Sequence, residues 1–447
     1  MLFYSTNLQS PSLSFAQALL MGQAPDRGLY MPANIPVLSP EEIAGFSTMA
    51  YHQIACTVMG RFLQDELPEG VLADLTKDAY DFDVPLEHVT ERQYVMRLDQ
   101  GPTASFKDFA ARMMGRLMNF YLQQENRKLL ILTATSGDTG SAIAHAFLGL
   151  DRIQVVVLFP KDEVTNRQRK QMTTLGKNIR VLALDGKFDD CQALVKQAFA
   201  DPDLSQLQLS SANSINIGRL IPQMVYYFYA YSRLAAQGEK IVFSVPSGNF
   251  GDMMGGMLAM KMGLPVEKFV IAVNGNDEFP AFLKTGRYEK IDPSKNCLSS
   301  AMNVGHPSNL ARLVALYGGQ MDEKGGIHEA CDIKLMQQEM WSTSISDTKT
   351  QQTMTEAWKS YRLLLEPHGA VGWAGLQEFQ KQHSRSGQLS VSLETAHPAK
   401  FPEEIERQLG FDPELPESLK GLGEKPEMFE MLETAYPAFK AFLLRTY

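Results

Sequence analysis

Short apolar runs alternate with helix-patterned segments through the middle of this 447-residue chain, and this alternation limits what it can fold into. Each run is long enough for one buried strand, and the segments between runs have the length and apolar spacing of helices. Strands separated by helices form parallel sheets that helices cover on both faces. The sequence therefore predicts an α/β fold, with strands at 129–133, 154–159, 179–184, 241–245 and 269–273 and helices at 109–122, 140–148, 165–175, 188–200, 216–236 and 251–262.

The regions on either side of this core predict further units. A chain of 447 residues is long enough for two to three domains with separate cores. We expect a small, mainly helical N-terminal unit, two α/β domains with open parallel sheets, and a C-terminal extension, at 1–90, 91–240, 241–410 and 411–447.

The pattern is weakest in the last third of the chain. It loosens between 275 and 388, where glycine-containing loops interrupt it. An apolar strand is expected at 389–393, and an amphipathic helix at 428–444 should end the extension.

The composition argues against several classes of function. Forty-two Lys and Arg residues face 51 Asp and Glu residues, so the net charge of −9 provides no basic surface for nucleic acid. No apolar run approaches the ~18 residues that span a bilayer, so no membrane partner is expected. The four cysteines are widely spaced without a metal-ligand pattern. We therefore expect a cytoplasmic protein with reduced thiols and no bound metal.

Lys107 is the most informative charged residue. It follows the rigid turn Gly101-Pro102-Thr103, and Asp108 comes next as an acidic helix opener. A helix dipole disfavours a cation at its N-terminus, so the position of this lysine needs another reason. An amine fixed at such a point suits Schiff-base formation, which predicts a catalytic lysine. The alternative is an ordinary solvated lysine at the start of a helix.

Two loops of one type join predicted strands to predicted helices. They run from Thr135 to Gly140 and from Pro246 to Asp252. Their glycines and hydroxyls let backbone N–H groups point at an anion near a helix N-terminus, although one such loop alone would more simply be a capped turn. Neither loop contains G-x-G-x-x-G, and no P-loop sequence occurs. Two such loops and a fixed lysine fit a phosphorylated cofactor with a carboxylate-bearing substrate, as pyridoxal phosphate with an amino acid would be.

Thr395 stands just after the predicted strand at 389–393. Its hydroxyl could contact a pyridine nitrogen without fully protonating it, which would moderate the ring as an electron sink. An isolated threonine at a strand end would more often be a local cap.

Five blocks of the sequence resemble the threonine synthase family, in the order 101–108, 133–140, 211–216, 246–252 and 394–401. The likeness runs from residue 3 to residue 401 and is greatest with the longer bacterial and fungal branch. Gln100 and Ser105 depart from it, since the family usually has His and Ala there. The absent imidazole removes a group that titrates near neutrality. The resemblance implies a fold-type II pyridoxal phosphate enzyme with two open α/β domains facing each other across the cofactor.

The same resemblance implies roles for individual residues. Lys107 would form the Schiff base, Asp138 would lie beside the pyridine hydroxyl, and Thr395 would face the ring nitrogen. The cofactor phosphate would be bound by Gly248, Asn249, Phe250 and Gly251. Substrate would be bound by Thr103, by the carboxylate-binding group Ser136, Gly137 and Thr139, and by the phosphate-binding candidates Ser214, Asn216, Arg219 and Lys400.

The reaction that the resemblance implies is conversion of O-phospho-L-homoserine and water to L-threonine and phosphate, the last step of threonine biosynthesis, with Lys107 as the base. A dianionic leaving group needs cations or strong donors in a water-poor pocket. The alternatives are a related lyase or dehydratase that eliminates from Cβ, and a catalytically silent binding module. The sequence is compatible with a monomer or a homodimer.

Overall fold

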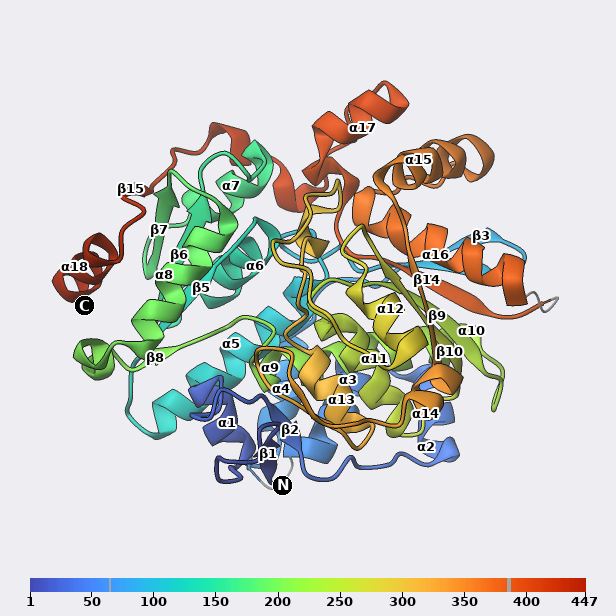
Figure 1. Ribbon diagram of the computed structural model, residues 1–447, viewed down its shortest axis with the longest axis horizontal. Coiled ribbons are helices and arrows are strands. Elements are labelled where there is room, and N and C mark those ends of the chain that lie inside the picture. The colour runs from blue at the N-terminus through green and yellow to red at the C-terminus, as the bar shows by residue number, and fades with distance from the viewer. Residues whose placement is uncertain (64–65, 384–386) are drawn as a thin grey trace.

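The computed structural model describes residues 1–63, 66–383 and 387–447 and contains two largely parallel sheets that lie side by side (Figure 1). The larger sheet has six strands in the order β13-β10-β9-β14-β4-β3. β3 pairs antiparallel with β4, and the other neighbours pair in parallel. The bounds are β3 Leu86–Thr90, β4 Gln93–Arg97, β9 Ile241–Pro246, β10 Val266–Val273, β13 Met340–Ser344 and β14 Ser390–Glu394.

Helices bury both faces of this larger sheet. Successive residues of a strand point to opposite faces, so Val242 and Phe243 enter different cores. Val242 packs in a cluster with Trp373 of α16 (Pro367–His383), and Phe243 packs in the main core with Met253 of α11 (Gly251–Lys261). Burial on both sides explains why these strands have continuous apolar sequences.

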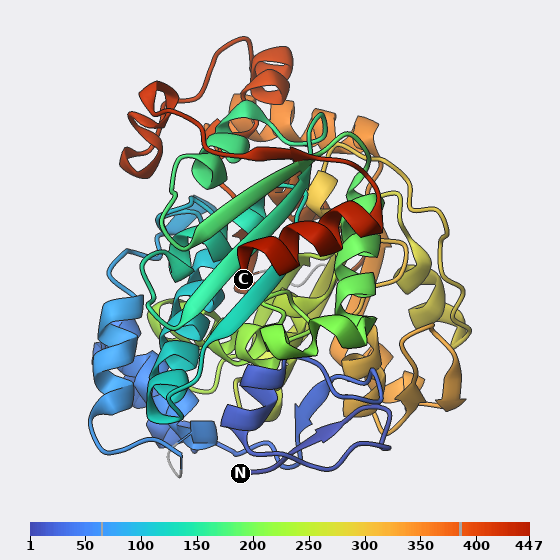
Figure 2. The ribbon, with the colours of Figure 1, turned by 90° about the vertical axis from the view of Figure 1, so that its left-hand side faces the viewer.

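The smaller sheet has five parallel strands in the order β15-β7-β6-β5-β8. Its central strands β5 to β7 coincide with three predicted strands. Helix α18 lies across one face of this sheet in Figure 2, and α8 packs in the same cluster. The bounds are β5 Leu129–Ala134, β6 Ile153–Pro160, β7 Ile179–Leu184, β8 Leu209–Ser210, β15 Glu430–Leu432, α5 Lys107–Gln124, α6 Asp138–Phe147, α7 Asn166–Thr173, α8 Phe188–Ala200 and α18 Tyr436–Thr446.

Residues 1–63 and 66–80 form a mainly helical unit beneath the two sheets, with one short antiparallel pair, between β1 and β2, in these ranges (Figure 1). Its elements are β1 Phe3–Ser5, α1 Phe15–Met21, β2 Tyr30–Pro32, α2 Pro40–Gly45, α3 Tyr51–Leu63 and α4 Val71–Ala79. Together with the two sheets, this unit confirms the predicted α/β fold class.

Two predicted helices differ from the structure, and a proline explains each difference. The expected helix at 216–236 is divided into α9 (Ile217–Leu220), a 3-10 turn η3 (Ile221–Met224) and α10 (Val225–Leu234), because Pro222 cannot donate the interior hydrogen bond. The expected helix at 428–444 begins at Tyr436, so that Pro437 lies in its first turn, where proline is tolerated. The residues before it form β15, which pairs with β7.

The region in which the sequence pattern loosens is well structured from 275 to 383, the part of it that the structure describes before the gap. It contains strand β13 and five helices, so the weak pattern reflects short elements joined by loops. They are α12 Glu278–Thr285, α13 Leu310–Leu316, α14 Ile333–Glu339, α15 Asp347–Tyr361 and α16, with β11 Gln320–Met321 and β12 Ile327–Glu329 between them; α17 Pro402–Leu409 follows later in the chain.

The domain ranges stay a prediction. Strand β4 precedes Lys107 in the chain but belongs to the sheet whose other parallel strands follow residue 240.

No helix within the described ranges combines the length and the apolar character needed to cross a membrane.

The packing of α18 generates a stability prediction. Phe439 is fully buried against the smaller sheet, whereas Leu444 on the same helix is 46% exposed. Phe439→Ala removes a buried ring and leaves a cavity, so it should lower the free energy of unfolding by about 3 kcal/mol. Leu444→Ala should change it by less than about 0.5 kcal/mol. Denaturant unfolding of both variants measures the difference, and equal effects would show that α18 is not packed as described.

Candidate active site

Lys107 is the first residue of α5, at the point where the chain leaves the larger sheet. Its Nζ lies 3.6 Å from Asp138 Oδ2, and its side chain is 12% exposed. Burial lowers the pKa of Lys107 below its ordinary value; Asp138 opposes that change, and the nearby cations Lys400 and Arg219 lower the pKa further. A larger share of this amine is therefore neutral and nucleophilic than in an exposed lysine.

The turn before Lys107 is built around the Asp108 carboxylate. Its Oδ2 accepts a hydrogen bond from Thr103 N at 2.9 Å, and its Oδ1 accepts one from the Thr103 hydroxyl at 2.6 Å. A Cβ on Gly101 would lie 2.5 Å from Asp108 Oδ2, so a side chain there would displace the carboxylate. These contacts with the Asp108 carboxylate explain the spacing of Gly101, Thr103 and Asp108. They also engage the Thr103 hydroxyl, which was predicted to bind substrate.

The lysine loop is hydrogen-bonded to the segment that carries Thr395. Phe106 N donates to Thr395 O at 2.9 Å, and His397 N donates to Ala104 O at 3.0 Å. Thr395 is 6% exposed, directly beyond strand β14. The structure therefore brings the predicted lysine and the predicted threonine together through the backbone, although they are far apart in sequence.

Asp138, the first residue of α6, is a buried carboxylate surrounded by donors. Its Oδ1 lies 2.7 Å from Lys400 Nζ and accepts a hydrogen bond from Gln168 Nε2 at 2.9 Å. Burial alone would raise the pKa of Asp138, but Lys400 and Lys107 outweigh that effect and hold the pKa well below its ordinary value. Asp138 is therefore ionised. Lys400 is fully buried, and its amine is paired with Asp138. It is therefore not a free cation that waits for the substrate phosphate.

The loop before α6 uses part of its hydrogen-bonding capacity internally. Thr135 Oγ1 accepts from Gly137 N at 2.9 Å and from Gly140 N at 2.8 Å, so these two N–H groups point at a side chain. Gly137 has a φ of 130°, a backbone angle that residues other than glycine rarely adopt. Ser136 and Thr139 are half-buried.

The second loop lies between β9 and α11. Phe250 caps α11 with a left-handed φ of 63°. A Cβ on Gly248 would lie 2.9 Å from Met302 Cα, so only glycine allows the backbone to approach this closely. Asn249 Oδ1 accepts from Ser308 N at 3.4 Å, which ties the loop to the start of α13.

Three of the residues predicted to bind the substrate phosphate lie beside this second loop: Ser214, Asn216 and Arg219. A Cβ on Gly251 would be 3.3 Å from Ser214 Cβ. Asn216 is fully buried and caps α9: its Nδ2 donates to two backbone carbonyls, at 2.8 and 2.9 Å, and its Oδ1 accepts from Gly218 N at 2.9 Å. The amide of Asn216 is thus used in the fold.

Arg219 is different, because its guanidinium is buried and incompletely paired. Its Nη1 donates to Ala212 O at 2.8 Å, and its Nε has no hydrogen-bond partner. Among the described residues, no carboxylate forms an ion pair with it. Burial lowers the pKa of Arg219 to about 10, with Asp108 opposing. The side chain remains charged at neutral pH and contributes to the positive potential at Lys107.

Sequence reasoning missed four residues that build the site. Gln168 orients Asp138, and a capping box with Thr165 was the local signal available. Arg312 is fully buried and donates to the backbone of 214–215 at 3.1 and 2.7 Å, and Gln171 donates to Thr103 O at 2.9 Å. Burial raises the pKa of Asp252 to about 6, although its Oδ1 accepts a hydrogen bond from the Tyr227 hydroxyl at 2.7 Å that opposes this change. Arg312 and Gln171 depend on long-range contacts that no local motif marks, whereas Asp252 ends the second predicted loop, where no role was assigned to it.

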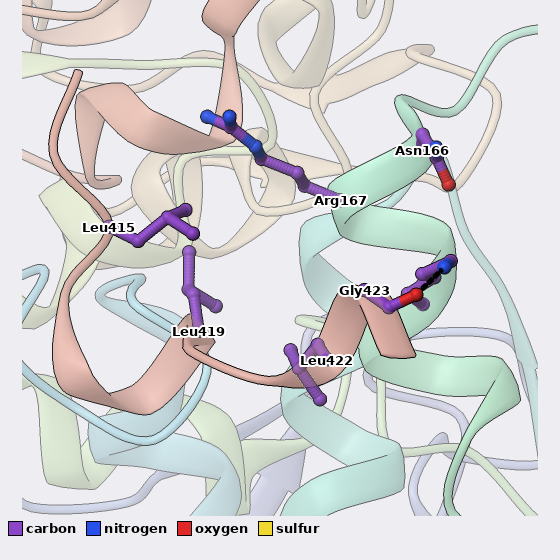
Figure 3. A pocket seen from close by; sticks show the side chains of 7 residues that line it. Asn166, Arg167, Leu415, Leu419, Leu422 and Gly423 are labelled. Atoms are coloured by element: carbon purple, nitrogen blue, oxygen red, sulfur yellow. Dashed lines mark hydrogen bonds between the residues drawn. The ribbon is translucent and has the colours of Figure 1, made fainter. Parts of the chain in front are cut away.

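Gln100 and the hollow between α7 and the C-terminal segment add nothing to this cluster. Gln100 is exposed and donates to Asp99 Oδ1 at 2.7 Å. The hollow of Figure 3 lies between α7 and the C-terminal segment, and its apolar wall is formed by Leu415, Leu419 and Leu422. None of the predicted site residues lines it.

Comparison with known proteins places this geometry in a family. Residues 2–80 match the family described as "Threonine synthase N terminus", 84–393 match "Pyridoxal-phosphate dependent enzyme", and 369–443 match "Threonine synthase, C-terminal". The threonine synthase of Haemophilus influenzae is 38% identical over 449 residues, covering 98% of this chain and 99% of the relative. That of Escherichia coli is 37% identical over 446 residues, covering 99% of each.

Solved structures agree. The pyridoxal-phosphate-bound threonine synthase of Brucella melitensis has a TM-score of 0.93 and 34% identity, covering 100% of this chain and 99% of that one. The yeast threonine synthase has a TM-score of 0.92 and 30% identity, covering 99% and 98%. The chain belongs to the threonine synthase family. It is a lyase that depends on pyridoxal phosphate, and it acts on a small molecule.

The residues at the site suit the cofactor of the threonine synthase family. Lys107 supplies an amine with a lowered pKa. Gly248 lets its loop pack closely against the backbone of residues 301–302, and the loop leads into the N-terminus of α11, where the helix dipole favours a phosphate. When bound, the cofactor would be held by Lys107, by the loop from Gly248 to Gly251, and by Asp138 and Thr395.

The close packing at Gly248 generates a prediction about cofactor affinity. A Cβ in Gly248→Ala would meet the backbone of residues 301–302 at 2.9 to 3.0 Å, so the loop must shift. We expect the dissociation constant for pyridoxal phosphate to rise about tenfold or more, equivalent to about 1.4 kcal/mol. Equilibrium titration of the apoenzyme measures it. Gly45→Ala is the control, since nothing lies within 4 Å of a Cβ there; equal affinities in the two variants would contradict the proposed phosphate loop.

Proposed function

We propose that this protein converts O-phospho-L-homoserine and water to L-threonine and phosphate, the last step of threonine biosynthesis, as a cytoplasmic monomer or homodimer. The observation that carries the proposal is the buried guanidinium of Arg219, which has an unpaired Nε and acts electrostatically on Lys107. A buried cation without a partner anion is costly, and a substrate phosphate would supply that anion. The family membership supports the same reaction.

Pyridoxal phosphate, when bound, would supply an electron-withdrawing ring that acidifies the C–H bonds near the amino group of the substrate, and that amino group would replace Lys107 on the cofactor and leave the lysine amine free. Lys107 is the base that removes these protons, because burial and neighbouring cations keep its pKa below the ordinary value. Arg219 binds the substrate phosphate and stabilises its charge as it leaves. Ser136 and Thr139, which are half-buried, orient the carboxylate, whereas the Gly137 N–H is used by Thr135 Oγ1.

Water exclusion follows from the burial of these groups. Arg219, Asp138 and Thr395 are all less than 7% exposed, and Lys107 is 12% exposed. Charge–charge interactions are stronger in such a site than in water, which favours departure of a dianion.

The deciding experiment measures both products. Cofactor-loaded protein is given O-phospho-L-homoserine, released phosphate is assayed, and the amino acid is identified by chromatography. Threonine formed in step with phosphate supports the proposal, and Lys107→Ala should abolish both. Phosphate released with 2-oxobutanoate and no threonine would point to a lyase that stops after elimination, and no turnover by loaded protein would contradict the proposal.

The role of Arg219 gives a separate prediction. Arg219→Met should lower kcat/KM for O-phospho-L-homoserine about 10²- to 10³-fold, since one donor to the developing charge is lost. The visible absorbance of the bound cofactor should be retained. Arg233→Met is the matched control, because that exposed arginine donates to backbone carbonyls of the N-terminal unit. If both variants have the same kcat/KM, Arg219 does not bind the phosphate.

A further inference from the structure

Two lysines share one buried carboxylate at the site. Lys400 Nζ lies 2.7 Å from Asp138 Oδ1, and Lys107 Nζ lies 3.6 Å from Asp138 Oδ2. The shorter contact belongs to Lys400, whose side chain is 0% exposed. Asp138 therefore pairs more closely with Lys400 than with the amine proposed to react.

The position of Lys400 is fixed on several sides. Its Nζ also donates to Thr103 O at 2.8 Å, in the turn before Lys107. Its backbone carbonyl accepts from the Thr165 hydroxyl at 3.1 Å. Gln168, on the same helix as that capping box, donates to Asp138 and holds the carboxylate in place. Lys400 is thus held by its surroundings, and no movement is needed to make the contact.

The charges that face Lys107 come from four helical elements and one loop. The cations are Lys400 of η5 (Pro398–Lys400) and Arg219 of α9. The carboxylates are Asp138 of α6, Glu366 just before α16, and Asp252 of α11, which is influenced by the charge of Lys107. Within this set, Asp138 is the one carboxylate of the described residues that makes an ion pair with Lys107.

We propose that Lys400 is a positioning residue that competes with Lys107 for Asp138 and thereby determines how tightly Lys107 holds its proton. This inference rests on the proposed function, in which Lys107 carries the cofactor. A base must release its proton readily and accept one from the substrate. If Asp138 faced Lys107 alone, the full negative charge would hold a proton on that nitrogen. Lys400 neutralises part of the negative charge of Asp138, and it does so by pairing with Asp138 and not with Lys107.

The test is a pH titration of the visible absorbance of the lysine-bound cofactor, which reports the proton on the Lys107 nitrogen. Lys400→Met should raise the pKa of that nitrogen by about 1, because a cation is lost and Asp138 then faces Lys107 alone. Asp138→Asn should lower it by a similar amount. A merely structural role would not shift the two variants in opposite directions.

Three further variants complete the design. Lys400→Arg retains the cation and should titrate like the wild type. Lys400→Met combined with Asp138→Asn removes both charges, leaves no buried carboxylate without its partner, and should titrate between the two single variants. Lys261→Met is the matched control, because it removes a lysine paired with Glu339 at 2.7 Å at the far end of α11; it should leave the titration unchanged.

The outcomes separate the inference from the proposed function. If the wild type binds the cofactor through Lys107 but Lys400→Met titrates like the wild type, the inference is wrong and the function stands. A lowered pKa in Lys400→Met would likewise overturn it. If the wild type has no absorbance from a lysine-bound cofactor, the proposed function and the inference both fail.

Discussion

A carboxylate inside a protein must be compensated by cations and hydrogen-bond donors, and at this site that requirement determines which segments come together. The carboxylate is Asp138, at the start of α6. Its compensation comes from Lys107 of α5, Gln168 of α7 and Lys400 of η5. The carboxylate therefore joins the lysine loop and the smaller sheet to the segment that follows the last strand of the larger sheet. The contact between Lys400 Nζ and Thr103 O alone joins residues 297 positions apart.

The backbone supports the same assembly. Strand β14 lies between β9 and β4, so the segment after it runs beside the loop that follows β4. Hydrogen bonds between 104–106 and 395–397 then align Thr395 with the lysine loop. Arg169 of α7 also pairs with Glu427 at 2.9 Å. This ion pair holds the C-terminal extension against α7, the helix that carries Gln168 and so orients Asp138. The hollow of Figure 3 lies between α7 and the same C-terminal extension.

Features encoded by neighbouring residues could be predicted from the sequence. The α/β class followed from the alternation of apolar runs and helices, and the place of Lys107 at a helix start is confirmed, while its role stays a prediction. The divided helix around Pro222 and the late start of α18 at Tyr436 were missed, because helical periodicity outweighed the prolines in the prediction. The partners of Asp138 could not be predicted, since Lys400 and Gln168 reach it only through the packing of separate elements. Asn216, expected at the substrate, instead caps α9 through a local hydrogen bond from Gly218 N, and its place at the start of the expected helix was a signal for that role.

The account depends most on Lys107 being the residue that carries the cofactor. The direct measurement is reduction of the loaded enzyme with borohydride, followed by proteolysis and mass spectrometry of the peptides. The account predicts that the reduced cofactor is attached to Lys107 at close to one equivalent per chain. Attachment to Lys400 or to another lysine would contradict it.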